Sequence, residues 1–151
     1  PLQPSDERRL QEFFYSHTQE TIQSRYGYMV SRMTRERAYE LVNVDQTKDL
    51  ALTLVEVQRP REVLHAVGRY YLDPAGKSAE VAFVTRETKR HCGLARALFD
   101  RMRAIAKKRG LASVHAQVLP ENEAMLGLFR SYKHKLARVA GSSAVEVEMP
   151  L

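Results

Sequence analysis

The sequence predicts a single α/β (α+β) domain, and two observations carry that prediction. Three short strand-forming segments separated by turns occupy 50–84, and helical and strand patterns then alternate over 93–149. The chain has 151 residues, of which 44% are hydrophobic, and this is enough for one core. No hydrophobic run approaches the roughly 20 residues that a membrane span requires. We therefore expect one domain that contacts no membrane.

The first half of the chain begins with segments of different kinds. Residues 1–6 resemble the tail of a first strand, and the chain starts at Pro1 instead of methionine, so we expect a domain excised from a larger protein. Leu10, Phe13 and Phe14 recur at helical spacing and predict a helix over 6–17. A second helix is expected over 35–42.

A three-stranded meander follows, and the second half alternates helices with strands. The meander strands are expected over 50–57, 63–71 and 78–84, with Asp73–Gly76 as a hairpin turn. Leu94, Leu98 and Met102 lie on one stripe of a helix predicted over 93–109, which Gly110 is expected to end. The remaining elements are a strand over 113–118, a helix over 122–132, and strands over 136–140 and 145–149.

The loop before the long helix is basic and contains a glycine, which is typical of an anion-binding site. The first N–H groups of a helix have no partner within the helix, and its positive dipole end favours a phosphate. Gly93 lacks a Cβ, so the main chain there can approach such a ligand closely. Neither the dinucleotide fingerprint nor the P-loop motif matches, because each requires further glycines at positions where this sequence has other residues.

Arg90, Gly93 and Ala95 match the pattern [Gln/Arg]-x-x-Gly-x-[Gly/Ala], and the strand over 113–118 and the helix opened by Asn122 follow in order. Over nearly its whole length the chain thus resembles the GCN5-related N-acetyltransferase (GNAT) family. The resemblance implies the GNAT fold, a central mixed, mostly antiparallel sheet of about six to seven strands flanked by helices. Segments 21–26, 41–45 leading into 50–52, and 122–126 are similar to the acetyltransferase domain of bacterial protein lysine acetyltransferases, which are often fused to acyl-CoA synthetase-like domains.

The function implied by the resemblance is acetyl-CoA-dependent transfer of an acetyl group to an amine, in this case a protein lysine. Glu80 lies ten residues before Arg90, where a glutamate in similar protein acetyltransferases removes the proton from the lysine. The alternative for Glu80 is a structural carboxylate on one face of the sheet, or one paired with an arginine. Phe129 stands where many members have a tyrosine that protonates the leaving thiolate, so no general acid is assigned. Lys133–His134 replaces the common Gly-Phe at the end of that helix.

The cofactor in this family is acetyl-CoA (coenzyme A), and the resemblance assigns its contacts. Main-chain groups of Phe83 and Val84 would bind the pantetheine arm as if it were another strand. Asn122 would reach the pantetheine region or only cap its helix. Arg90 would contact the pyrophosphate or brace the loop. The pyrophosphate itself would rest on the N–H groups of His91, Cys92, Gly93, Leu94, Ala95 and Arg96.

Composition and residue spacing argue against several other classes of function. The net charge is +6, from 24 Lys and Arg against 18 Asp and Glu, but the basic residues are scattered and no nucleic-acid-reading motif occurs, so we expect no nucleic-acid partner. The histidines lack metal-ligand spacing, so no metal is expected. A single cysteine, Cys92, and the lack of a secretory signal fit a cytoplasmic protein. Two alternatives remain open: acetylation of a small amine, and a non-catalytic CoA-binding sensor domain.

Overall fold

The computed structural model describes residues 1–26 and 32–151. The helical elements are η1 (Pro4–Asp6), α1 (Glu7–Tyr15), α2 (Gln19–Tyr26), α3 (Arg35–Val42), η2 (Glu87–Lys89), α4 (Leu94–Lys108) and α5 (Glu123–Arg130). The strands are β1 (Leu50–Gln58), β2 (Arg61–Leu72), β3 (Ser78–Thr85), β4 (Ser113–Val118), β5 (Lys135–Arg138) and β6 (Val145–Pro150). Among the described residues, no helix is long and apolar enough to cross a bilayer.

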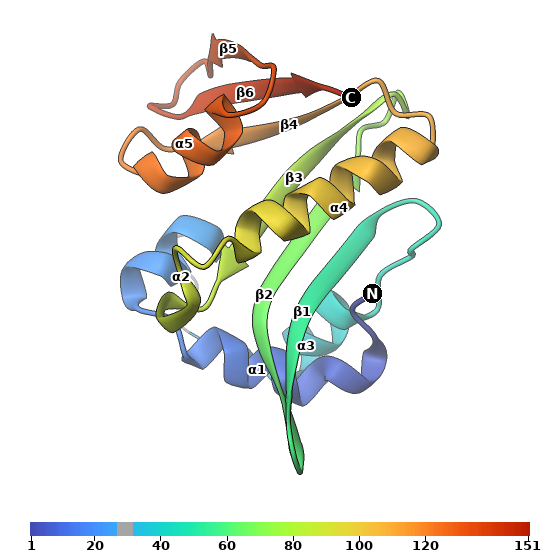
Figure 1. Ribbon diagram of the computed structural model, residues 1–151, viewed down its shortest axis with the longest axis vertical. Coiled ribbons are helices and arrows are strands. Elements are labelled where there is room, and N and C mark those ends of the chain that lie inside the picture. Colours follow the sequence, from blue (N-terminus) through green and yellow to red (C-terminus); the bar gives the residue numbers. More distant parts are fainter. Residues whose placement is uncertain (27–31) are drawn as a thin grey trace.

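Within the described part of the chain, six strands form one sheet in the order β1-β2-β3-β4-β6-β5 (Figure 1). Neighbouring strands pair antiparallel except β3 and β4, which are parallel. The loop, α4 and the turn at Gly110 together form the crossover that such a parallel pair needs. The prediction of a mixed, mostly antiparallel sheet flanked by helices is therefore confirmed.

Helices cover both faces of the sheet (Figure 1), and β3 contributes to both layers. Phe83 packs in one core with residues of α4 and α5, whereas Val84 packs in a second core with residues of α1 and α3. This alternation follows from the two-residue period of a strand. The first core includes Leu98, Phe99, Met102, Leu126 and Phe129, and the second includes Leu10, Phe13, Val42, Leu64 and Val67.

Helix α4 lies close to β2 because β2 carries a glycine at the contact. A Cβ added at Gly68 would lie 2.6 Å from the Met102 sulfur and 2.9 Å from a methyl carbon of Leu98. Gly68 also pairs in register with Phe83 of β3. The absence of a side chain at this position therefore sets how closely the helix and the central strands approach.

The N-terminal segment differs from the prediction. Residues 1–6 do not form the tail of a strand: Leu2 donates one hydrogen bond to the Ala51 carbonyl, at 2.9 Å, and Pro4 then starts the short helix η1. The fixed φ of proline suits a first helical position, and the Asp6 carboxylate accepts a hydrogen bond from the Gln3 N–H at 2.9 Å. Local helix-start signals therefore override the extended pattern.

Helix α2 is absent from the predicted elements, and the helix predicted over 6–17 ends earlier, at Tyr15. The apolar residues of α2 do not recur at helical spacing, and the segment is fixed by the packing of Ile22 against Phe14 of α1 and Ala38 of α3. The other predicted helices and strands are confirmed, with ends that differ by up to two residues. Gly110 ends α4 with φ +83°, as its position predicted.

Candidate functional site

The strands β3 and β4 are paired over only part of their length. Ser78–Glu80 pair with Ser113–His115, and the register stops there although the strands continue to Thr85 and Val118. The two strands thus form a fork that opens toward their carboxyl ends, and they diverge in Figure 1. We call this opening the β3–β4 fork. Along 81–85, the edge of β3 that faces β4 lacks a strand partner, so its main-chain groups are available to a ligand.

Two helices begin at the open end of the β3–β4 fork. The loop after β3 leads into α4, and the loop after β4 leads into α5. The carboxyl ends of parallel strands followed by helix N-termini are a common place for ligands, because unpaired N–H groups converge there.

The N-terminus of α4 has no side-chain cap. Among the described residues, none of the backbone N–H groups of 91–96 donates a hydrogen bond to the protein. His91 and Gly93 both have left-handed backbones, with φ of 61° and 74°, and these turn the loop sharply into the helix. Cys92 is exposed, and its Sγ lies 3.6 Å from the Arg90 carbonyl oxygen. The arrangement fits an anion such as a pyrophosphate, which would satisfy these donors.

Glu80 lies at the apex of the β3–β4 fork, since it is the last residue of β3 that pairs with β4. Its side chain is exposed and makes no hydrogen bond or ion pair with another described residue. Its register neighbours are Tyr71 of β2 and His115 of β4. Nε2 of His115 lies 3.0 Å from the Asp73 carboxylate, and among the described residues no ion pair joins His115 to Glu80.

Asn122 occupies the other side of the fork, at the start of α5. Its Oδ1 accepts a hydrogen bond from the Met125 N–H at 3.3 Å, so the helix-cap role that the sequence left open is present. Its amide nitrogen donates to no described residue. The cap fixes the side chain and leaves its donor group for a ligand.

Phe129 of α5 is part of the core. It is 1% exposed and packs against Phe83 and Phe99, with ring centroids 5.5 Å and 5.4 Å apart. Tyr132 does not take the place of the missing tyrosine, because its hydroxyl donates to Asp100 at 2.6 Å beside Arg103. Burial and the Asp100 carboxylate raise the pKa of Tyr132 to about 12. Neither side chain is placed to protonate a leaving group at the fork.

The loop before α4 is attached to the start of α2 by contacts that the sequence did not predict. The Thr18 N–H donates to Glu87 at 2.9 Å, and Nδ1 of the buried His17 lies 3.1 Å from the same carboxylate. Burial alone would raise the pKa of Glu87, but hydrogen bonds from Thr18, Thr21 and His17 outweigh this and lower it to about 2. Burial lowers the pKa of His17, so its ring is neutral at neutral pH and Nδ1–H donates to Glu87. The sequence carried no signal for these contacts, which join residues 69 and 70 positions apart.

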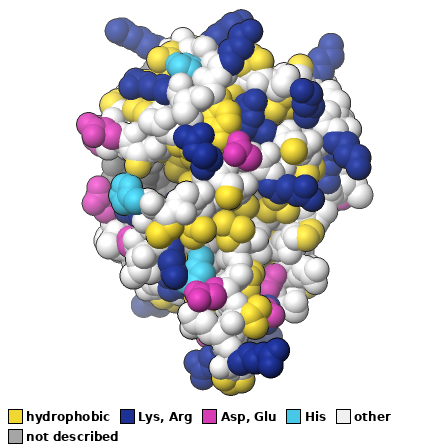
Figure 2. Space-filling model, in the orientation of Figure 1, with side chains coloured by type: hydrophobic (Ala, Val, Ile, Leu, Met, Phe, Trp, Pro, Cys, Tyr) yellow, Lys and Arg dark blue, Asp and Glu magenta, His cyan; other side chains and the backbone are white. Residues whose placement is uncertain are grey.

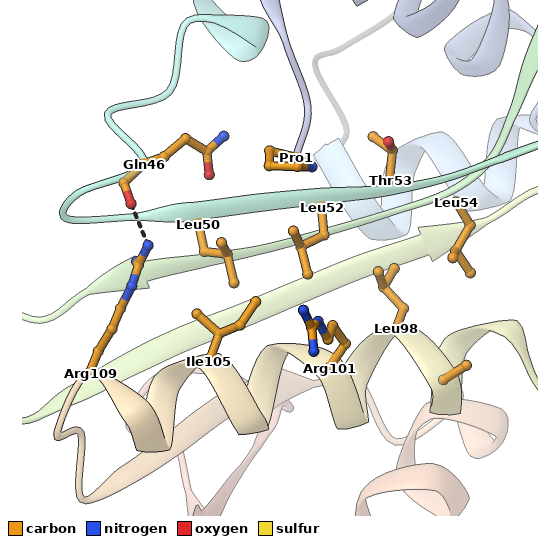
Figure 3. A pocket seen from close by; sticks show the side chains of 11 residues that line it. Pro1, Gln46, Leu50, Leu52, Thr53, Leu54, Leu98, Arg101, Ile105 and Arg109 are labelled. Atoms are coloured by element: carbon orange, nitrogen blue, oxygen red, sulfur yellow. Dashed lines mark hydrogen bonds between the residues drawn. The ribbon is translucent and has the colours of Figure 1, made fainter.

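A groove of about 390 Å³ lies between β1 and α4 (Figure 3). Leu50, Leu52 and Leu54 of β1 face Leu98 and Ile105 of α4 across it. One end is closed by Arg109, which donates to the Gln46 carbonyl at 2.5 Å. None of the residues expected to bind acetyl-CoA lines this groove.

The basic side chains on the face shown in Figure 2 are spread over the surface, with acidic side chains among them. Several cations have defined structural partners. Arg109 binds main-chain carbonyls, and Arg96 donates to the Ser131 hydroxyl at 3.0 Å. Part of the positive charge therefore serves to connect elements of this fold.

Comparison with known proteins identifies this fold as that of the GNAT acetyltransferases. The acetyltransferase (GNAT) family matches residues 11–132. The chain belongs to this family.

Solved structures with the same fold include the GNAT domain of PAT from S. lividans, which has a TM-score of 0.87 and 24% identity and covers 100% of this chain and 88% of that one. The PaiA N-acetyltransferase from Thermoplasma acidophilum, in complex with coenzyme A, has a TM-score of 0.74 and 16% identity. The match covers 99% of this chain and 96% of that one. The ribosomal-protein-S18-alanine N-acetyltransferase from Escherichia coli has a TM-score of 0.66 and 15% identity. The match covers 97% of this chain and 88% of that one.

Proposed function

We propose that this chain is an acetyl-CoA-dependent N-acetyltransferase that acetylates a protein lysine by direct transfer, with Glu80 as general base. The observation that carries the proposal is the β3–β4 fork, with a carboxylate at its apex and uncapped N–H groups at its open end. Membership of the GNAT family and the coenzyme A complex of PaiA support the choice of cofactor.

The residues of the fork fit acetyl-CoA, which supplies an activated acetyl thioester. The N–H groups of 91–96 would bind its pyrophosphate, with Arg90 adding a cation beside them. The unpaired edge of β3 at Phe83 and Val84 would bind the pantetheine arm through main-chain hydrogen bonds. The amide nitrogen of Asn122 would bind from the opposite side of the fork.

Glu80 would accept the proton that an alkylammonium group must lose before it can attack. The neutral amine nitrogen would then form a bond to the acetyl carbon, and the carbon–sulfur bond would break with its electron pair leaving on the thiolate. The new amide nitrogen would lose its second proton to solvent. No described side chain at the fork replaces the missing tyrosine, so solvent would protonate the thiolate. Positioning of the two substrates and proton removal by Glu80 would provide the catalysis.

The exposure of Glu80 favours a protein acceptor over a small amine. A closed acidic pocket would suit a small amine, whereas Glu80 is exposed and lines neither the groove beside β1 nor the hollow between α1 and the turn from β1 to β2. A lysine side chain on a protein surface can instead reach a carboxylate on an open face of a sheet.

The test combines isothermal titration of acetyl-CoA with an acetyl-transfer assay on a protein substrate mixture, read by mass spectrometry. Glu80→Gln should lower kcat/KM at least about 100-fold and leave the Kd for acetyl-CoA unchanged. Glu148→Gln is the matched control, since Glu148 is exposed on β6 and is the register neighbour of His115 on its other side. It should keep activity within about twofold.

Three outcomes would contradict the proposal in different ways. Binding of acetyl-CoA without transfer to any protein or small amine would indicate the sensor function. Transfer to small amines alone would exclude the lysine acceptor. Equal losses in Glu80→Gln and Glu148→Gln would exclude Glu80 as the specific base.

A further inference from the structure

Arg90 is held by a hydroxyl from a distant part of the chain. Its Nη2 donates to Oγ1 of Thr21, in α2, at 2.7 Å, although the two residues are 69 positions apart. Thr21 is 8% exposed, whereas the Arg90 side chain is 47% exposed. A buried acceptor thus fixes one nitrogen of a guanidinium on a side chain that is about half exposed.

Glu87 strengthens the same attachment. Its carboxylate accepts from the Thr18 N–H at 2.9 Å and lies 3.7 Å from Nη2 of Arg90. Because the pKa of Glu87 is about 2, this carboxylate is ionised at neutral pH and favours the arginine position. Two independent contacts therefore join the loop before α4 to the first turn of α2.

The Thr21 hydroxyl is not required as a cap for α2. That role belongs to Thr18, whose Oγ1 accepts from the Thr21 N–H at 3.3 Å. The Thr18 hydroxyl also donates to the Thr21 hydroxyl at 3.1 Å, which orients the lone pairs of Thr21. Outside its own helix, the Thr21 hydroxyl accepts from Arg90 and donates to Glu87, so both contacts hold the loop before α4.

We propose that Thr21 is a positioning residue that holds the Arg90 guanidinium beside the N–H groups of 91–96, ready to bind the pyrophosphate of acetyl-CoA. This inference rests on the proposed function. An arginine fixed before binding loses less side-chain entropy when it binds a phosphate, so affinity depends on the residue that fixes it. The effect is confined to the pyrophosphate, because neither Thr21 nor Arg90 is assigned a contact with the acetyl group.

The test compares two acetyl donors in two variants. Thr21→Val keeps the shape and removes the hydroxyl, whereas Thr21→Ser keeps the hydroxyl. Thr21→Val should raise KM for acetyl-CoA about tenfold and change kcat less than about twofold. Thr21→Ser should restore KM to within about twofold of the unchanged protein. S-acetylpantetheine has no pyrophosphate, so its KM should be equal in all three proteins.

Arg90→Gln supplies a second measurement that does not depend on Thr21→Val alone. Glutamine also satisfies the family pattern at this position, and adding Thr21→Val to Arg90→Gln should raise KM for acetyl-CoA no further. Equal rises in KM for both donors, or additive effects in the double variant, would overturn the positioning role. Wild-type protein that binds no acetyl-CoA would overturn the proposed function and this inference with it. Wild-type binding that Thr21→Val leaves unchanged would overturn this inference alone.

Discussion

The two helix N-termini at the β3–β4 fork are built differently. The start of α5 is satisfied locally, since the Asn122 side chain accepts from the Met125 N–H three residues later. The start of α4 has Gly93 instead, with no side-chain cap and with unbonded N–H groups over 91–96. A helix end that is not satisfied within its own sequence is suited to an external anion.

The N-termini of α4 and α5 are also held in place by different kinds of contact. The cap on α5 acts over three residues, whereas the loop before α4 is attached by Glu87 and Arg90 to the start of α2, about 70 residues away. A binding loop can therefore leave its main-chain donors unbonded and still be ordered. Long-range side-chain contacts hold the start of α4 in place, whereas a local cap holds the start of α5.

The largest effect should follow from placing a negative charge at the start of α4. Gly93→Glu should weaken acetyl-CoA binding at least about 100-fold by isothermal titration, because the carboxylate competes for the N–H groups and repels the pyrophosphate. Gly141→Glu is a matched control, since both glycines have positive φ and open space where a Cβ would lie. Equal losses of binding in the two variants would show that backbone strain, and not the site, is responsible.

Acid should weaken the attachment of the loop. The pKa of Glu87 is lower in the folded state than its ordinary 4.5, so its stabilising contribution is complete above about pH 5 and is lost as pH falls toward 2. After allowance for solvent screening, we expect Glu87 to account for roughly 1–2 kcal/mol of the loss in unfolding free energy between pH 6 and pH 3. Denaturant titrations at both pH values should show a smaller difference for Glu87→Gln. An unchanged difference would contradict the attachment.

Substitutions of Asn122 can separate its role as the cap of α5 from its proposed role in binding acetyl-CoA. Asn122→Ala should lower the free energy of unfolding by about 1 kcal/mol, because the Met125 N–H loses its acceptor. Asn122→Asp keeps a capping oxygen and removes the amide donor, so stability should be retained while the Kd for acetyl-CoA rises about fivefold. Unchanged binding by Asn122→Asp would leave the residue as a cap only.

The smallest effect is expected at α3, far from the fork. The Thr34 hydroxyl accepts from the Arg37 N–H at 3.1 Å and caps this helix in an exposed position. Thr34→Ala should cost about 0.5 kcal/mol in chemical denaturation and leave acetyl-CoA binding unchanged. Weakened acetyl-CoA binding by Thr34→Ala would show that a general loss of stability also impairs the binding site. The binding losses expected in the other variants would then not be specific to the altered residues.

The sequence by itself determined the elements that depend on local pattern. The apolar stripe of α4, its end at Gly110 and the hairpin turn at Asp73–Gly76 could all be predicted, because each depends on residues a few positions apart. The loop Arg90–Gly93 and its resemblance to a known family could also be read directly. Short η1 and α2 could not, because the first competes with an extended pattern and the second owes its order to packing.

Only the tertiary structure decided how the site is assembled. The point at which β3 and β4 separate, and hence the position of Glu80 at the apex, depends on strand pairing across the long α4 crossover. The contacts of Thr21 and Thr18 with the loop before α4 depend on α2 packing beside it. Local sequence fixes backbone preferences over a few residues, whereas these contacts join segments that are distant along the chain and meet only in the folded protein.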